Sequence, residues 1–83
     1  MKNMNTKAYV LIETNVGHTK EIIRILQKIK NVMTVDPVTG PYDIIAVIQA
    51  KDLEETGKII TDKIHIIPGI IRTITCLTVH ISK

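Results

Sequence analysis

The stretch that decides the fold is Val38–Ala50, with the sequence VTGPYDIIAVIQA. Its first part indicates a turn, because Gly40 can adopt backbone conformations closed to other residues and Pro41 fixes φ. Its second part, residues 44–50, is apolar almost throughout, which favours a strand near the centre of a sheet. A shorter apolar run at 32–35 precedes the turn. The stretch therefore predicts two strands joined by a turn.

Strand and helix patterns alternate on both sides of this stretch. Upstream, residues 8–14 form a short apolar strand pattern, and residues 18–30 carry apolar side chains at helical spacing. Downstream, residues 52–67 repeat an apolar helical face that stops at Pro68-Gly69, and residues 72–81 alternate as a last strand. This order is that of the split βαβ unit. We therefore predict the α+β class and a ferredoxin-like βαββαβ fold, a four-stranded antiparallel sheet with two helices on one face.

The second predicted helix has a marked start and an unusual glycine. Asp52, followed three residues later by Glu55, matches the spacing of a capping box, with Asp in place of Ser or Thr at the N-cap. Leu53 and Gly57 fall on the predicted apolar face of this helix. Glycine inside a helix costs about 1 kcal/mol relative to alanine, so we expect Gly57 to allow a close approach of the helix to the sheet.

The composition limits the classes of protein that need to be considered. The chain has 83 residues, 45% hydrophobic and 23% charged, which predicts one domain, 1–83, with its core at about 7–81. Two tyrosines are the only aromatic residues and the net charge is +3, which argues against nucleic-acid binding through stacked bases. A single cysteine excludes a disulfide framework and a cysteine-rich zinc site, and we predict no metal and no cofactor. No apolar run is long enough for a signal peptide or a membrane span, so we expect a cytoplasmic protein without membrane contact.

The predicted sheet is apolar on both faces, although two helices can cover only one of them. The strands at 8–12 and 44–48 show this pattern, where a solvated face would alternate apolar and polar residues. We therefore expect the second face to pack on another copy of the chain, giving a homo-oligomer.

The residues that commonly carry catalysis are few and scattered. Cys76 lies inside the last predicted strand, where we expect a buried, inert thiol. His18, His65 and His80 show no close ligand spacing, and His65 is predicted on the solvated face of the second helix. We therefore expect a protein that is not an enzyme.

A basic stripe follows the first predicted helix on the side away from its apolar residues. Contact with phosphate or an acidic partner is one interpretation, and a solvated helix face is the favoured one. The stripe consists of Lys20, Arg24 and Lys28.

The turn in the middle of the chain is also the most informative place for a binding site. Tyr42 and Asp43 follow Gly40 directly, and Asp43 precedes the most apolar strand. Asp43 can bind backbone N–H groups in a hairpin turn, or it can hold a ligand ammonium while loop amides hold a carboxylate. Thr73 and Thr75 share one face of the last strand and either offer hydroxyl donors or reflect β-propensity. The residues alone leave these alternatives open.

Three segments resemble the effector-binding domain of the Lrp/AsnC transcriptional regulators, also called the RAM domain. Residues 38–43 match its turn of Thr-Gly, one residue, an aromatic residue and Asp. Residues 67–70 close the second helix as the family's Pro-Gly segment does, and residues 73–75 match its Thr-x-Thr. The resemblance covers about 7–81. It implies a domain that dimerises through its sheet, assembles further into rings or tetramers of dimers, and binds amino-acid effectors between dimers.

The resemblance also implies which residues form the effector pocket. His18 is added on position alone, because it follows the first strand in the loop before the helix. The residues are Gly40, Tyr42, Asp43, Thr73, Thr75 and His18.

The chain departs from the family in one large respect. Family regulators carry an N-terminal helix-turn-helix, whereas only residues 1–7 precede the first predicted strand. We therefore expect a stand-alone form without direct nucleic-acid binding, which modulates transcription through partner proteins. These partners would include full-length Lrp/AsnC-type regulators.

Two alternatives stay open. One is a ligand-free oligomerisation module for full-length relatives. The other, ranked last, is an enzyme of the dimeric α+β barrel type, for which only His18, Asp43 or His80 could serve as acid or base.

Overall fold

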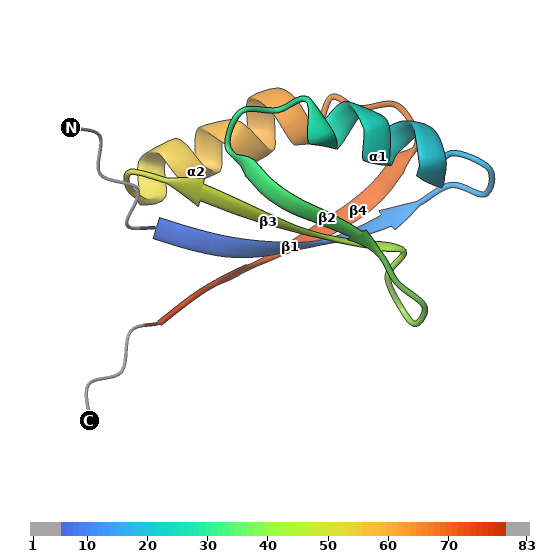
Figure 1. Cartoon of the computed structure of the whole chain (residues 1–83), viewed down its shortest axis with the longest axis horizontal. Helices are drawn as coiled ribbons and strands as arrows, with labels where there is room; N and C mark the ends of the chain where they lie inside the picture. The colour runs from blue at the N-terminus through green and yellow to red at the C-terminus, as the bar shows by residue number, and fades with distance from the viewer. Residues whose placement is uncertain (1–5, 80–83) are drawn as a thin grey trace.

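Four strands form one antiparallel sheet in the order β2-β3-β1-β4, and the helices lie along one face of it (Figure 1). The computed structural model describes residues 6–79. The predicted ferredoxin-like fold is confirmed, whereas the last strand, predicted over 72–81, ends at Leu77, and His80 lies outside the described residues. The elements are β1 (Thr6–Thr14), α1 (Thr19–Gln27), β2 (Val32–Pro37), β3 (Ile44–Ala50), α2 (Leu53–Ile59), a π-helical segment η1 (Ile60–Ile64) and β4 (Ile70–Leu77).

The core lies between the two central strands and the helices. Alternate residues of β1 and β3 point toward the helices, and those within 8–12 and 44–50 are fully buried, which is the periodicity of strands with one covered face. Each large aliphatic side chain buried in this way contributes about 1.5–3 kcal/mol. The main members are Val10, Ile12, Ile44, Ile48, Ile22, Leu26 and Ile64.

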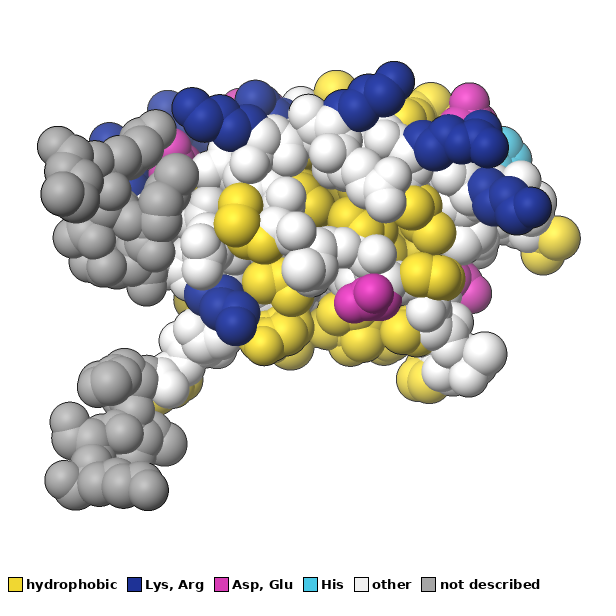
Figure 2. All heavy atoms as spheres, viewed as in Figure 1, with side chains coloured by type: hydrophobic (Ala, Val, Ile, Leu, Met, Phe, Trp, Pro, Cys, Tyr) yellow, Lys and Arg dark blue, Asp and Glu magenta, His cyan; other side chains and the backbone are white. Residues whose placement is uncertain are grey.

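The first helix is shorter than predicted. It ends at Gln27, because the next two backbone N–H groups bond three residues back, from Lys28 to Ile25 and from Ile29 to Leu26. Such i→i−3 bonds tighten the last turn and end the α-helix. The basic residues predicted on its outer side are exposed, and Lys and Arg side chains line this side of the molecule in Figure 2.

The predicted start of the second helix is confirmed, but its interior is not regular. The Asp52 carboxylate accepts a hydrogen bond of 2.8 Å from the Glu55 backbone N–H, and the Glu55 carboxylate accepts one of 2.7 Å from the Lys51 N–H. From Ile60 onward the helix widens into a π turn, in which the His65 N–H donates to the Ile60 carbonyl. A π turn accommodates one more residue than an α turn, which the even 100° spacing used for prediction does not anticipate.

Two residues on the predicted apolar face of this helix were predicted wrongly. Leu53 is 62% exposed because it is the first residue of α2 and lies at its open end. Gly57 is exposed, and a methyl group added there would meet no atom within 4 Å. The buried neighbour Thr56 takes the position facing the core, so Gly57 makes no close approach to the sheet.

The opposite face of the sheet carries no helix, and we call it the open face. Its apolar members are Tyr9 and Leu11 on β1, Ile45 and Val47 on β3, and Ile74 and Cys76 on β4. Hydrophobic side chains gather along this lower side of the molecule in Figure 2. Cys76 pairs with Tyr9 and is exposed, so the prediction of a buried thiol was wrong. The register of β4, which the sequence could not supply, turns its side chain to the uncovered face.

The two edge strands differ from each other. β2 has a register shift between Val32 and Thr34 against β3, and it ends at Pro37, which has no N–H to donate. β4, from Ile70 to Leu77, also has a register shift, between Glu13 and Thr14 of β1, but it contains no proline, and most of its residues are exposed.

Candidate functional site

The predicted turn between β2 and β3 is closed by backbone hydrogen bonds. The Val38 N–H donates to the Asp43 carbonyl and the Asp43 N–H donates to the Ile12 carbonyl, each at 2.9 Å. Gly40 has φ of 132°, a conformation that side-chain-bearing residues rarely adopt. The loop projects from one end of the sheet, on the side away from the helices (Figure 1). Its residues are therefore accessible to a partner or ligand.

Asp43 ties three elements together at this end of the sheet. Its Oδ2 accepts a hydrogen bond of 2.8 Å from the Thr14 backbone N–H and one of 3.3 Å from the Thr14 hydroxyl. That hydroxyl lies 2.9 Å from the hydroxyl of Thr19, the first residue of α1. The carboxylate thus has the backbone-binding role that was one of the two predicted alternatives. Its second oxygen, Oδ1, forms no hydrogen bond with the residues that the structure describes.

Tyr42 forms a small cluster with two charged residues on the open-face side. The Arg72 guanidinium lies over the Tyr42 ring, with Cζ 5.5 Å from the ring centroid. Arg72 Nε is 3.3 Å from Glu13 Oε1, and both side chains are partly exposed. An exposed ion pair of this kind contributes at most about 1 kcal/mol. Sequence reasoning missed Arg72 and Glu13, because only the pairing register of β1 and β4 shows that they are neighbours.

Thr73 and Thr75 lie on the helix side of β4. They pair with Ile12 and Val10, whose side chains are buried beneath the helices. β4 is an edge strand that the helices leave uncovered, so Thr73 is half-buried and Thr75 is exposed. The Thr73 hydroxyl lies 2.9 Å from Nε2 of His65, a contact that sequence reasoning missed.

His18 lies at the start of α1, at the same end of the sheet as Asp43. It occupies the N-cap position but makes no side-chain capping bond. Its ring packs against Gly69, where an added Cβ would lie 2.8 Å from the His18 Cβ. The Asn15 N–H donates to the Gly69 carbonyl and holds the two loops together. His18 therefore borders the site and supports the turn before β4.

The structure brings some of the predicted site residues together and separates others. Tyr42, Asp43 and His18 lie at the end of the sheet where β1 ends and β3 and β4 begin. Tyr42 reaches Arg72 on the open-face side, whereas Thr73, the next residue along β4, points to the other face. One copy of the chain therefore does not gather all of these residues around one cavity.

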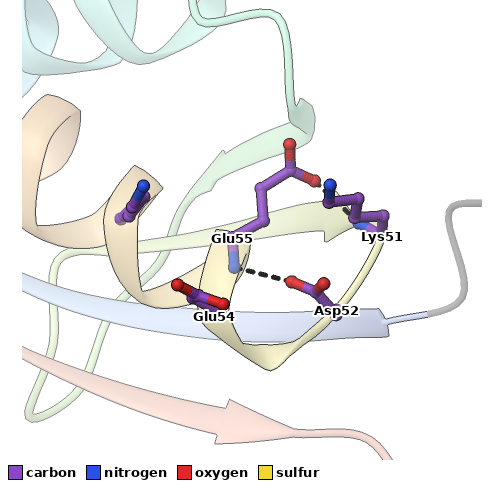
Figure 3. Close-up of a pocket in the computed structure, with 5 residues that line it drawn as sticks. Lys51, Asp52, Glu54 and Glu55 are labelled. Carbon is purple, nitrogen blue, oxygen red and sulfur yellow. Dashed lines mark hydrogen bonds between the residues drawn. The ribbon is translucent and has the colours of Figure 1, made fainter.

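A pocket at the start of α2 contains none of the predicted site residues. It is lined by charged side chains, two of which, Asp52 and Glu55, form the helix cap described above (Figure 3). Capping explains this arrangement without a ligand. The lining residues are Lys51, Asp52, Glu54, Glu55 and Lys58.

Neither a metal cluster nor a membrane span is found in the part of the chain that the structure describes. Within residues 6–79, no three His, Cys, Asp or Glu side chains are grouped closely enough to hold a metal ion. Among the same residues, no helix has the length and apolar character needed to cross a membrane.

The sheet, its one-sided helical cover and the accessible loops at its end define a small α+β domain of the ferredoxin-like class. A family model described as the Lrp/AsnC ligand binding domain matches residues 7–83. The chain belongs to this family.

Known relatives agree with this assignment. An uncharacterized HTH-type transcriptional regulator of Pyrococcus furiosus is 37% identical over 79 residues, which are 92% of this chain and 53% of that protein. A solved structure from Thermus thermophilus has a TM-score of 0.88 at 31% identity, covering 94% of this chain and 98% of that one. The Neisseria meningitidis regulator NMB0573, solved as a complex with L-Met, shares the fold, with a TM-score of 0.86 at 14% identity over 98% of this chain and 54% of that one. The chain spans about half the length of the curated relatives it matches, and these are transcriptional regulators rather than enzymes.

Proposed function

We propose that this domain senses a small effector, a free amino acid, bound at an interface between dimers, and that it modulates transcription through partner proteins. Membership of a ligand-binding family supports binding of a small molecule. The L-Met complex of the Neisseria meningitidis regulator supports an amino acid as the chemical class. A cytoplasmic location and the lack of direct nucleic-acid contact stay predictions of the same proposal.

The observation that carries the proposal is the separation of the predicted site residues within one copy. Tyr42 lies at the rim of the open face, whereas Thr73 and Thr75 lie on the other side of β4. A ligand that contacts both groups must lie between copies. Binding would then favour one assembly over another, because only a difference in affinity between two states can shift their equilibrium.

The open face supports the first step of assembly, a dimer. Its six apolar side chains come from three adjacent strands, and no element of the described chain covers them. Exposed apolar surface of this kind is typical of a protein interface. A second copy presenting the same face would bury it in an isologous contact.

The direct test is thermal unfolding of the purified protein with each of the twenty amino acids at millimolar concentration. A ligand present at about 100 times its Kd adds about 2.7 kcal/mol of apparent stability. We expect a shift with one or a few amino acids, together with a change in assembly size by light scattering. If none of the twenty amino acids shifts the unfolding temperature, the proposal is wrong.

A second candidate is a ligand-free interaction module that assembles with full-length relatives. The observation in its favour is that Asp43, Tyr42 and Thr73 each already contact another side chain of the same chain. In that case a pull-down would recover DNA-binding relatives, and the yield would not change when amino acids are added.

A further inference from the structure

The π turn at the end of the second helix determines where His65 lies. The His65 N–H donates to the carbonyl of Ile60, five residues back, at 2.8 Å. Ile64 stays fully buried in the core, while His65 is exposed and brings Nε2 to 2.9 Å from the Thr73 hydroxyl. π turns inside helices occur frequently at functional sites, and the side chain that this π turn brings to the edge of the sheet is His65.

The contact with His65 decides what the Thr73 hydroxyl can offer to a ligand. A hydroxyl has one proton to donate and two lone pairs that accept. If Nε2 carries the ring proton and donates it to Thr73, the Thr73 proton is free for an oxygen of a ligand. If Thr73 instead donates to an unprotonated Nε2, it can only accept, and a carboxylate finds no donor there.

Only the first arrangement lets the Thr73 hydroxyl donate to a carboxylate, because its own proton is then not engaged by His65. Thr75 lies on the same face of β4, about 6.6 Å further along the strand. Its hydroxyl is exposed and forms no hydrogen bond with the described part of the chain. Two hydroxyl donors thus face the same uncovered side of the edge strand.

We propose that His65 is a positioning residue for the carboxylate group of the amino-acid ligand. Nε2 of His65 donates to Thr73 Oγ1, and Thr73 and Thr75 then donate their hydroxyl protons to the two oxygens of the carboxylate. This inference rests on the proposed amino-acid function and adds a residue and a role to it. It also assigns the carboxylate end of the ligand to the helix side of β4.

The test compares four variants with the wild-type chain. His65→Leu removes the ring nitrogen, His65→Gln restores an N–H donor of similar reach, and Thr73→Val removes the hydroxyl. Thr61→Val is the matched control, an exposed threonine on η1 with no side-chain hydrogen bond to the residues described. All four variants change positions at the surface or close to it, and unfolding without ligand confirms that each variant is folded.

The probes are the twenty amino acids and their α-carboxamides, which keep the ammonium and side chain but lack the carboxylate. Affinities of the amino acids that shift wild-type unfolding are then measured by calorimetric titration. We expect His65→Leu and Thr73→Val to weaken amino-acid binding about 10- to 100-fold, the range for losing a hydrogen bond to a charged group. The affinity of the matching carboxamide should change little, and His65→Gln should recover most of the loss.

Three other outcomes would overturn the inference, and they show whether the proposed function fails with it. If wild type binds an amino acid and His65→Leu binds it equally well, His65 has no such role while the proposed function stands. If His65→Leu weakens the amino acid and its carboxamide equally, the residue does not act on the carboxylate. If no amino acid binds the wild-type chain, both the proposed function and this inference are wrong.

Discussion

Replacing Asp43 by alanine tests whether the hydrogen bonds of this carboxylate stabilise the fold. Its Oδ2 accepts hydrogen bonds from the backbone N–H and the hydroxyl of Thr14, a residue only 8% exposed. Removing the acceptor leaves a nearly buried N–H without a partner and breaks a charge-assisted bond. The expected loss in the free energy of unfolding is about 2–3 kcal/mol. For a domain of this size, that loss lowers Tm by roughly 10–20 °C.

The measurement is urea unfolding followed by circular dichroism, with two companion variants. Asp43→Asn keeps an oxygen that accepts from the Thr14 N–H, so we expect a loss of about 1 kcal/mol. Asp36→Ala removes an exposed aspartate on β2 and should change stability by no more than about 0.5 kcal/mol. If Asp43→Ala unfolds at the same urea concentration as Asp36→Ala, the structural role assigned to Asp43 is wrong. If the role is right, binding experiments at this position need Asp43→Asn, because the alanine variant changes folding and binding together.

Three further substitutions have defined outcomes. Gly57→Ala should raise the free energy of unfolding by about 0.5–1 kcal/mol, since the added methyl group meets no atom and alanine favours the helix; lower stability in urea unfolding would contradict this. Gly69→Ala should lower the free energy of unfolding more than Gly17→Ala does. Both glycines have positive φ, but only at Gly69 would the added Cβ clash with His18; equal losses would show that the His18 side chain moves aside without cost. Ile74→Lys on the open face should shift the chain to monomers in size-exclusion chromatography with light scattering, and an unchanged mass would refute an interface there.

The features that depend on local sequence could be predicted well. Continuous apolar runs located both central strands, and Asp52 with Glu55 marked the start of α2. The exposed side chain of Cys76 depended instead on the register of β4 against β1, which is set by contacts distant in the sequence. Gly57 was assigned to the wrong face because an even helical spacing was extended through a segment that contains a π turn.

The turn at the candidate site was predictable from the sequence, whereas the contacts of its residues were not. The turn at Gly40 follows from glycine and proline chemistry, and the structure has the required positive φ there. The partners of the site residues were missed, because Arg72 and Glu13 become neighbours only through strand pairing. His65 reaches Thr73 only through the π turn. No pattern within a single segment reports contacts of this kind.

The unequal edges of the sheet set a limit on growth by strand addition. At β2, the register shift and Pro37 interrupt the row of backbone donors that another strand would need. β4 also has a register shift, against β1 between Glu13 and Thr14, but it contains no proline, so its unbroken row of donors from Arg72 to Leu77 is the longer of the two free edges. Two copies joined at their β4 strands would present their β2 edges outward, where the register shift and Pro37 leave fewer donors for a third sheet. The shorter β2 edge thus disfavours open-ended growth of a chain rich in isoleucine.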